Sequence, residues 1–222
     1  MPGHCGQLAG ECMSSYASLN LDYPFRGRWQ VRNSPANRVP SHGTSLFGLS
    51  YAIDFVPVDA GERSAPFTAR SLFRSEPPEA FVGFGRSILS PVEGLVVGVH
   101  DGEVDHASYR GFPSVGYAMT QRRRVTAGGH ALMGNHVLIE TAHTSGIAVV
   151  ALCHLQRDSI DVTTGQHVVS GQLVGHCGNS GNSTEPHLHL HAVNGRDITR
   201  ADAVPIQFNG SIPRNGTVVE VG

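Results

Sequence analysis

The stretch EPHLHLHAV, residues 185–193, places a histidine at every second position: His187, His189 and His191. In a β-strand, residues i, i+2 and i+4 point to the same face, so the three imidazoles would share one face and the intervening leucines the other. The leucine face is typical of a buried core. Neutral imidazole is the commonest metal ligand near neutral pH, so a metal site is the favoured interpretation of the histidine face. An inert, solvated row of histidines is the alternative.

The rest of the chain consists of short apolar segments separated by turns that contain glycine. Such segments, with β-branched and aromatic residues, indicate strands of ordinary length. We find no internal repeat and no long helical pattern. We therefore predict an all-β domain, with single strands or strand–turn–strand units at 51–59, 88–99, 134–143, 146–155 and 163–178, followed by the histidine strand.

The length of 222 residues suits one domain with insertions. We predict an N-terminal segment packed on the domain at 1–40, the domain itself at 41–208, and a C-terminal tail at 209–222. Two stretches with little periodicity, about 60–86 and 100–131, are expected to be long loop insertions that wall a groove.

The formal net charge of −2 and the sequence pI near 6.7 provide no bulk field for nucleic acid or an anionic membrane. No apolar run reaches membrane-spanning length, and the first residues lack the pattern of a secretory signal. The chain as written is thus expected in the cytoplasm, unless it is exported by another route.

The four cysteines form no CxxC pair, and Cys153 and Cys177 are expected to be buried thiols. The sequence does not indicate an oligomeric state.

Several motifs follow one another in a characteristic order. They are YAIDF at 51–55, SPVEGLVVGV at 90–99, Gly134-Asn135, His154-Leu155, Gly165, Gly171-Gln172, Gly175, GNSG at 178–181 and PHLH at 186–189. This combination closely resembles the lysostaphin/LytM-like zinc metallopeptidases, which cut peptidoglycan cross-bridges. The resemblance covers roughly residues 40–207. It implies a sandwich-like, antiparallel duplicated hybrid motif fold.

The resemblance also implies roles for individual residues. His189 and Asp54 match zinc ligands of the family, and His154 and His187 match its catalytic histidines. One Zn²⁺ per chain would activate water and polarise a peptide carbonyl, while the two catalytic histidines orient the water and transfer its proton.

The third zinc ligand departs from the family pattern. In the family, a histidine usually precedes the aspartate by four residues, but Ser50 stands there in this chain. We predict that His42 replaces it, through a turn at Phe47-Gly48 that brings His42 back to Asp54. His191 is expected beside the ligands or at the surface, without a role as a ligand.

The implied function is that of a zinc-dependent metalloendopeptidase acting on peptidoglycan stem peptides or cross-bridges. Ser50 favours one alternative, a catalytically inactive relative that serves as a binding or activator domain. The missing signal peptide leaves open a zinc peptidase with another peptide substrate. A phosphocarrier of similar β-architecture is a further alternative, which Asp54 and the segment 178–189 fit poorly.

Overall fold

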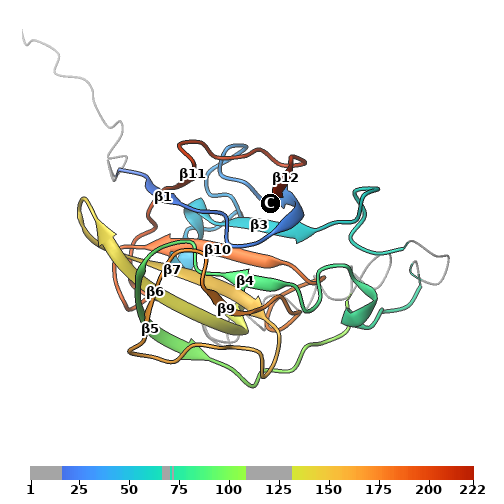
Figure 1. Cartoon of the computed structure of the whole chain (residues 1–222). Helices are drawn as coiled ribbons and strands as arrows, with labels where there is room; N and C mark the ends of the chain where they lie inside the picture. The colour runs from blue at the N-terminus through green and yellow to red at the C-terminus, as the bar shows by residue number, and fades with distance from the viewer. Residues whose placement is uncertain (1–16, 67–70, 72, 109–131) are drawn as a thin grey trace, which may run out of the picture.

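The computed structural model describes residues 17–66, 71, 73–108 and 132–222, and its largest element is an eight-stranded antiparallel sheet (Figure 1). The strand order is β12-β2-β3-β10-β7-β6-β5-β8. The strands are β2 (Gly27–Arg32), β3 (Ile53–Pro57), β5 (Gly94–His100), β6 (Asn135–His143), β7 (Gly146–Leu155), β8 (His167–Val168), β10 (Leu188–Val193) and β12 (Val218–Val221). The histidine strand β10 thus lies inside the sheet, between β3 and β7. The predicted all-β, antiparallel fold is confirmed.

Two small sheets complete the described architecture. Strand β4 (Ser87–Leu89) pairs antiparallel with β9 (Leu173–His176), and β1 (Leu19–Leu21) pairs parallel with β11 (Ile206–Phe208). The 3₁₀ turns η1 (Leu46–Tyr51) and η3 (Pro78–Ala80) are short. None of the helices in the described part of the chain combines the length and apolar character needed to cross a bilayer.

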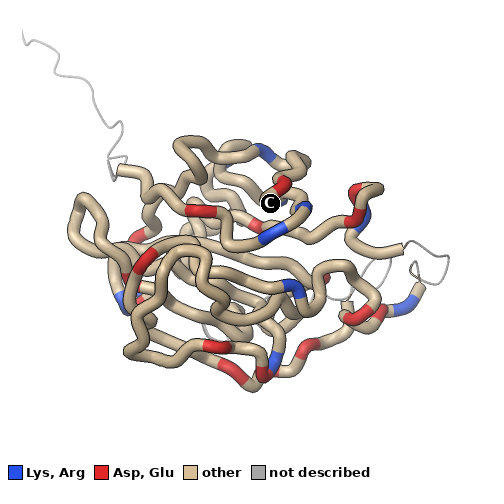
Figure 2. Tube along the Cα trace, in the orientation of Figure 1, with Lys and Arg blue, Asp and Glu red and all other residues tan. Residues whose placement is uncertain are grey.

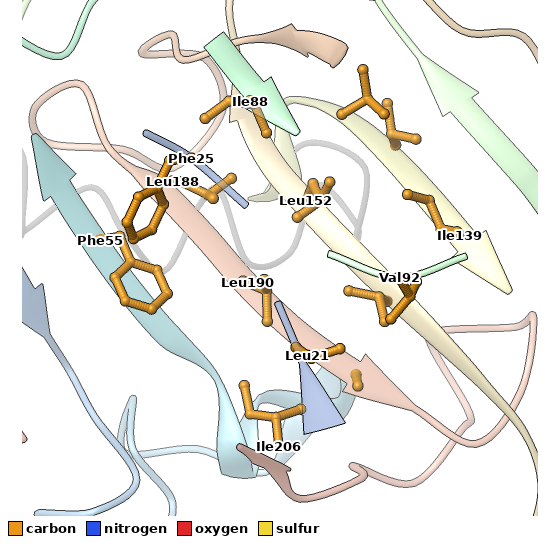
Figure 3. Close-up of a cluster of buried hydrophobic side chains, with 14 of the residues drawn as sticks. Leu21, Phe25, Phe55, Ile88, Val92, Ile139, Leu152, Leu188, Leu190 and Ile206 are labelled. Atoms are coloured by element: carbon orange, nitrogen blue, oxygen red, sulfur yellow. The ribbon is translucent and has the colours of Figure 1, made fainter. Parts of the chain in front are cut away.

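The main hydrophobic core lies against one face of the large sheet. Leu188 and Leu190 of β10 are fully buried in it, together with Phe55 of β3 and Leu152 of β7 (Figure 3). These residues alternate along their strands as a period of two requires. Burial of such side chains contributes roughly 1.5–3 kcal/mol each, so this face holds β3, β10 and β7 in register.

The opposite face of the same strands carries polar groups beside a smaller apolar cluster. Val149, Cys153 and Val193 belong to that cluster. His189 and His191, which alternate with the leucines of β10, lie on this second face. The predicted division of the strand into a leucine face and a histidine face is therefore present.

The described parts of the two predicted insertions contain mostly turns. Residues 73–86 and 100–108 are joined by an antiparallel bridge between Glu76 and Ser108. The remainder of the second insertion, 109–131, lies outside the described residues. The predicted domain boundaries stay predictions; strands β2 and β12 both belong to the large sheet.

Charged residues are sparse and mixed in sign. Figure 2 shows acidic and basic positions interspersed along the described trace.

Cys153 and Cys177 are buried free thiols, as predicted, and burial raises the pKa of each far above its usual value. Neither cysteine is therefore a thiolate at neutral pH.

Candidate metal centre

The sheet register places a carboxylate directly beside the histidine strand. His189 of β10 lies opposite Asp54 of β3 and, on its other side, opposite Cys153 of β7. His189 Nδ1 is 2.8 Å from Asp54 Oδ1. The second carboxylate oxygen, Oδ2, is 3.1 Å from His42 Nε2. Two imidazoles therefore meet on the two oxygens of one carboxylate.

A tight turn brings His42 to this place. The predicted turn at Phe47-Gly48 is present, and both residues adopt the left-handed conformation, at φ 56° and 72°. The backbone N–H of Ser41 donates to the carbonyl of Ser50 at 3.0 Å, which closes the loop at its base. Ser50 thus anchors the loop through its carbonyl, while His42 occupies the position beside Asp54.

The donor set of the cluster fits a zinc ion. Ligand atoms of His42, Asp54 and His189 all lie within 4.8 Å of one another. Tetrahedral zinc with bonds of about 2.0–2.1 Å needs ligand atoms roughly 3.4 Å apart, which small side-chain rotations would provide. Two imidazoles and one carboxylate match the composition of catalytic zinc sites, which keep a fourth position open. The three residues therefore form a possible metal site.

The carboxylate at the centre of the cluster is buried and ionised. Burial alone would raise the pKa of Asp54, but the charges of His42 and His187 and hydrogen bonds from His189 and His42 hold it well below its usual range. Only 6% of Asp54 is exposed. A buried carboxylate that stays charged attracts a cation, since an unpaired charge there would be strongly unfavourable.

His187, which immediately precedes β10, has its tautomer fixed by its neighbours. The hydroxyl of Ser183 donates to the carbonyl of Glu185 at 2.8 Å, so both groups act as acceptors toward His187 Nδ1, at 3.0 and 2.8 Å. Nδ1 therefore carries the proton in the neutral ring. The lone pair on Nε2 then faces the cluster, 3.7 Å from Asp54 Oδ1.

His154 reaches the cluster because the backbone leaves regular strand geometry there. Strict alternation after Leu152 and Cys153 would turn residue 154 toward the main core. Instead His154 has φ 63°, and Leu155 enters that core. The ring of His154 lies 4.8 Å from that of His187 and 5.7 Å from that of His189, measured between centroids. A left-handed non-glycine residue costs about 1–2 kcal/mol, and such strain gathers at functional sites.

Neighbouring groups hold this irregular backbone in place. His154 Nδ1 donates to the carbonyl of Ser180 at 2.9 Å, which leaves the lone pair on Nε2. The hydroxyl of Ser180 donates to Leu155 O at 2.8 Å and accepts from the N–H of Asn135 at 3.0 Å. Burial, together with the charges of His187 and His189, lowers the pKa of His154 well below its usual value. The ring is therefore neutral at pH 7.

His191 lies beside the ligand cluster rather than at the surface. It is 1% exposed, and its ring centroid is 5.3 Å from that of His189. Neither ring nitrogen has a hydrogen-bond partner among the described residues. Burial lowers the pKa of His191 well below its usual value. The buried ring is therefore neutral, and its desolvated nitrogens are unfavourable for stability.

Asn33 contacts the cluster, although the sequence motifs did not point to it. It follows the last residue of β2, and its Nδ2 donates to Asp54 Oδ2 at 2.7 Å. A single asparagine after a strand usually marks only a turn, so no spacing rule could have selected it. The register between Arg32 and Asp54 would have been needed to find it.

Two further histidines, His136 and His143, differ in their surroundings. His136 on β6 is 1% exposed, and its Nδ1 is 2.7 Å from the carbonyl of Gly134. His143, at the far end of the same strand, contacts Ser145 and the carbonyl of Ala17 in the hairpin region. Neither belongs to the cluster around Asp54.

The chain is similar to several solved structures. One is the catalytic domain of lysostaphin from Staphylococcus simulans, with 15% identity over 85% of this chain and 88% of that chain and a TM-score of 0.38. The catalytic domain of a mutant of EnpA, a prophage-encoded M23 protein from Enterococcus faecalis, has 19% identity over 88% and 92% and a TM-score of 0.40. A putative peptidase M23 from Pseudomonas aeruginosa has 18% identity over 86% of this chain but only 50% of its own length, with a TM-score of 0.42. No curated protein matches the sequence.

The sequence model of peptidase family M23 matches residues 82–200. This segment contains His154, His187 and His189, whereas His42 and Asp54 precede it. The match spans more than half of the chain and agrees with the resemblance carried by the motifs. The chain therefore belongs to peptidase family M23, the family of the lysostaphin/LytM-like peptidases.

Proposed function

We propose that the protein is a zinc-dependent metalloendopeptidase, with one Zn²⁺ held by His42, Asp54 and His189 and with His154 and His187 as catalytic residues. The observation that carries this proposal is the meeting of two imidazoles on the buried carboxylate of Asp54. The rings of His154 and His187 lie beside that cluster, and the hydrogen bonds made by Nδ1 of each ring leave its Nε2 directed elsewhere. An inactive relative would have no need for this complete set.

The chemistry of the site divides between the metal and the two histidines. A zinc ion in this position supplies Lewis-acid chemistry, because it lowers the pKa of a coordinated water and polarises a peptide carbonyl. His187 Nε2 accepts one proton from the attacking water, whose oxygen bonds to the carbonyl carbon. As the C–N bond breaks, the histidine pair delivers that proton to the leaving amine. The 4.8 Å between the ring centroids of His154 and His187 suits such a shared transfer.

The substrate we propose is a peptide bond in the stem peptides or cross-bridges of peptidoglycan. Membership of family M23 and the resemblance of the motifs to lysostaphin/LytM-like peptidases support this choice. Lysostaphin is described as an antimicrobial peptidase, and another similar structure as a putative glycyl-glycine endopeptidase.

Metal content is the first test. Elemental analysis of the gently purified protein should find one zinc per chain. His42→Ala and Asp54→Ala should each lose most of it, because two ligands hold zinc weakly. His167→Ala, an exposed histidine of β8, is the matched control and should keep the metal. Full zinc occupancy in His42→Ala would refute the assignment of that ligand.

Hydrolysis is the second test. The zinc-loaded protein should release new amino termini from purified peptidoglycan, identified by mass spectrometry, and His187→Ala should abolish the release. Zinc binding without hydrolysis of peptidoglycan or of oligoglycine and mixed peptide libraries would favour a binding or activator domain. Cleavage of library peptides alone would point to a substrate outside the cell wall.

A further inference from the structure

We propose that Asn33 is a positioning residue for the metal ligand Asp54, holding its carboxylate in the orientation that the ion requires. This inference rests on the proposed zinc site. It concerns a residue that lies outside the segment matched by the family model and directly follows strand β2.

The contact is short and buried. Asn33 Nδ2 donates to Asp54 Oδ2 at 2.7 Å, and Asp54 is 6% exposed. The pairing of Arg32 with Asp54 in the β2–β3 ladder sets the position of Asn33 along the strand. Asn33 has φ 48°, a left-handed conformation that asparagine tolerates better than most residues. Backbone geometry and side-chain chemistry thus favour the same residue type.

The contact matters because the other donors to Asp54 are lost when metal binds. Without metal, His189 lies on Oδ1 and His42 on Oδ2. An imidazole nitrogen that ligates a metal must be unprotonated, so neither nitrogen can then donate to the carboxylate. His187 Nε2 lies 3.7 Å from Asp54 Oδ1, which is beyond hydrogen-bond distance. Within the described residues, the Asn33 amide is then the side-chain donor that still restrains Asp54.

A neutral amide also suits this place for an electrostatic reason. An arginine or lysine there would neutralise the carboxylate and weaken its attraction for a cation. The amide fixes the orientation of the carboxylate and leaves its charge available to the ion. Groups that orient metal ligands in this way typically contribute about 10–100-fold to metal affinity.

Two variants remove the amide with different effects on the backbone. Asn33→Gly keeps the left-handed conformation accessible, and Asn33→Ser keeps a side chain whose hydroxyl is too short to reach Asp54. The matched control is Asn209→Gly, because Asn209 has φ 49° and lies exposed, away from the cluster. Thermal unfolding of the three metal-free proteins should show that they remain folded.

The measurement is zinc affinity by competition with a chromogenic chelator. We expect about 10–100-fold weaker binding in both Asn33 variants and wild-type affinity in Asn209→Gly. The visible absorption of the cobalt(II)-substituted protein should shift in the Asn33 variants, because the geometry of the ligand changes. A purely structural role would lower thermal stability without changing the cobalt spectrum.

The outcomes separate this inference from the proposed function. If the wild type binds zinc and hydrolyses its substrate, and both Asn33 variants bind zinc within twofold of it with the same cobalt spectrum, the positioning role is overturned and the enzyme remains. If the wild type itself binds no zinc, the proposed function fails and the role of Asn33 fails with it.

Discussion

The turn that carries His42 depends on a glycine that no other residue can replace without distortion. Gly48 has φ 72°, and a Cβ added to it would lie 2.1 Å from Val193 Cγ1 on β10. Replacing Gly48 by alanine therefore combines backbone strain with a steric clash against the strand that bears His189. The loop has to move away from β10, and His42 moves with it.

The two effects have separate magnitudes. An alanine in the left-handed region costs about 1–2 kcal/mol, and overpacking a filled site costs about 1–3 kcal/mol more. Gly48→Ala should therefore lower the free energy of unfolding by about 2–5 kcal/mol, a large part of the roughly 5–15 kcal/mol typical of a domain. A shift of His42 that removes about 1.4 kcal/mol of binding energy weakens zinc affinity tenfold.

Gly165→Ala isolates the strain term. Gly165 has φ 92°, and a Cβ added to it would meet nothing within 4 Å among the described residues. Urea unfolding and zinc titration of both variants are the assays. Gly165→Ala should lose only the strain of about 1–2 kcal/mol, with zinc affinity unchanged. If Gly48→Ala matched Gly165→Ala in both stability and zinc affinity, the close packing of the His42 turn on β10 would be refuted as the basis of the site.

Three further predictions concern the metal-free protein. Its free energy of unfolding should fall as pH drops below about 6.5, because burial lowers the pKa of His154, His189 and His191 in the folded protein. The unfolded chain then binds more protons, and each additional proton costs about 1.4 kcal/mol of stability per pH unit. Urea unfolding between about pH 8 and about pH 5 measures this dependence, and a flat profile would contradict the reasoning. His191→Leu should raise the free energy of unfolding by about 1–2 kcal/mol, because it removes two buried ring nitrogens without hydrogen-bond partners among the described residues. It should also reduce the number of protons taken up on unfolding in acid by about one. A lower free energy of unfolding would mean that the ring has a favourable partner. Ser180→Ala should cost about 1–3 kcal/mol in urea unfolding, because it leaves the carbonyl of Leu155 and the N–H of Asn135 without this hydroxyl; an unchanged midpoint would show that the hydroxyl is dispensable.

Much of the sheet could be predicted from the sequence because periodicity and burial coincide in it. The alternation of His and Leu in β10 predicted its two faces, and the apolar runs of β3, β6 and β7 predicted strands that the structure contains. The parallel pairing of β1 with β11 could not be predicted, because three-residue segments have no periodicity to read. The place of β12 beside β2 likewise depends on tertiary contacts between the two ends of the described chain.

The site was predictable only where a motif or a turn marked it. The resemblance supplied His189, Asp54, His154 and His187, and the flexible Phe47-Gly48 pair suggested how His42 could return to Asp54. The contact of Asn33 with Asp54 depends on the β2–β3 register, which one sequence does not encode in any short pattern. The backbone at His154 was equally hidden, since an apolar strand pattern predicts regular alternation through that residue.

The left-handed backbone at His154 lowers the stability of the fold at the same position that carries one of the proposed catalytic imidazoles. Asparagine and glycine occupy that conformation more easily than histidine, so His154→Asn or His154→Gly would relieve backbone strain while removing the imidazole for which we propose a role in proton transfer. The change that would relieve the strain of this backbone is therefore the one that would remove the imidazole proposed for catalysis.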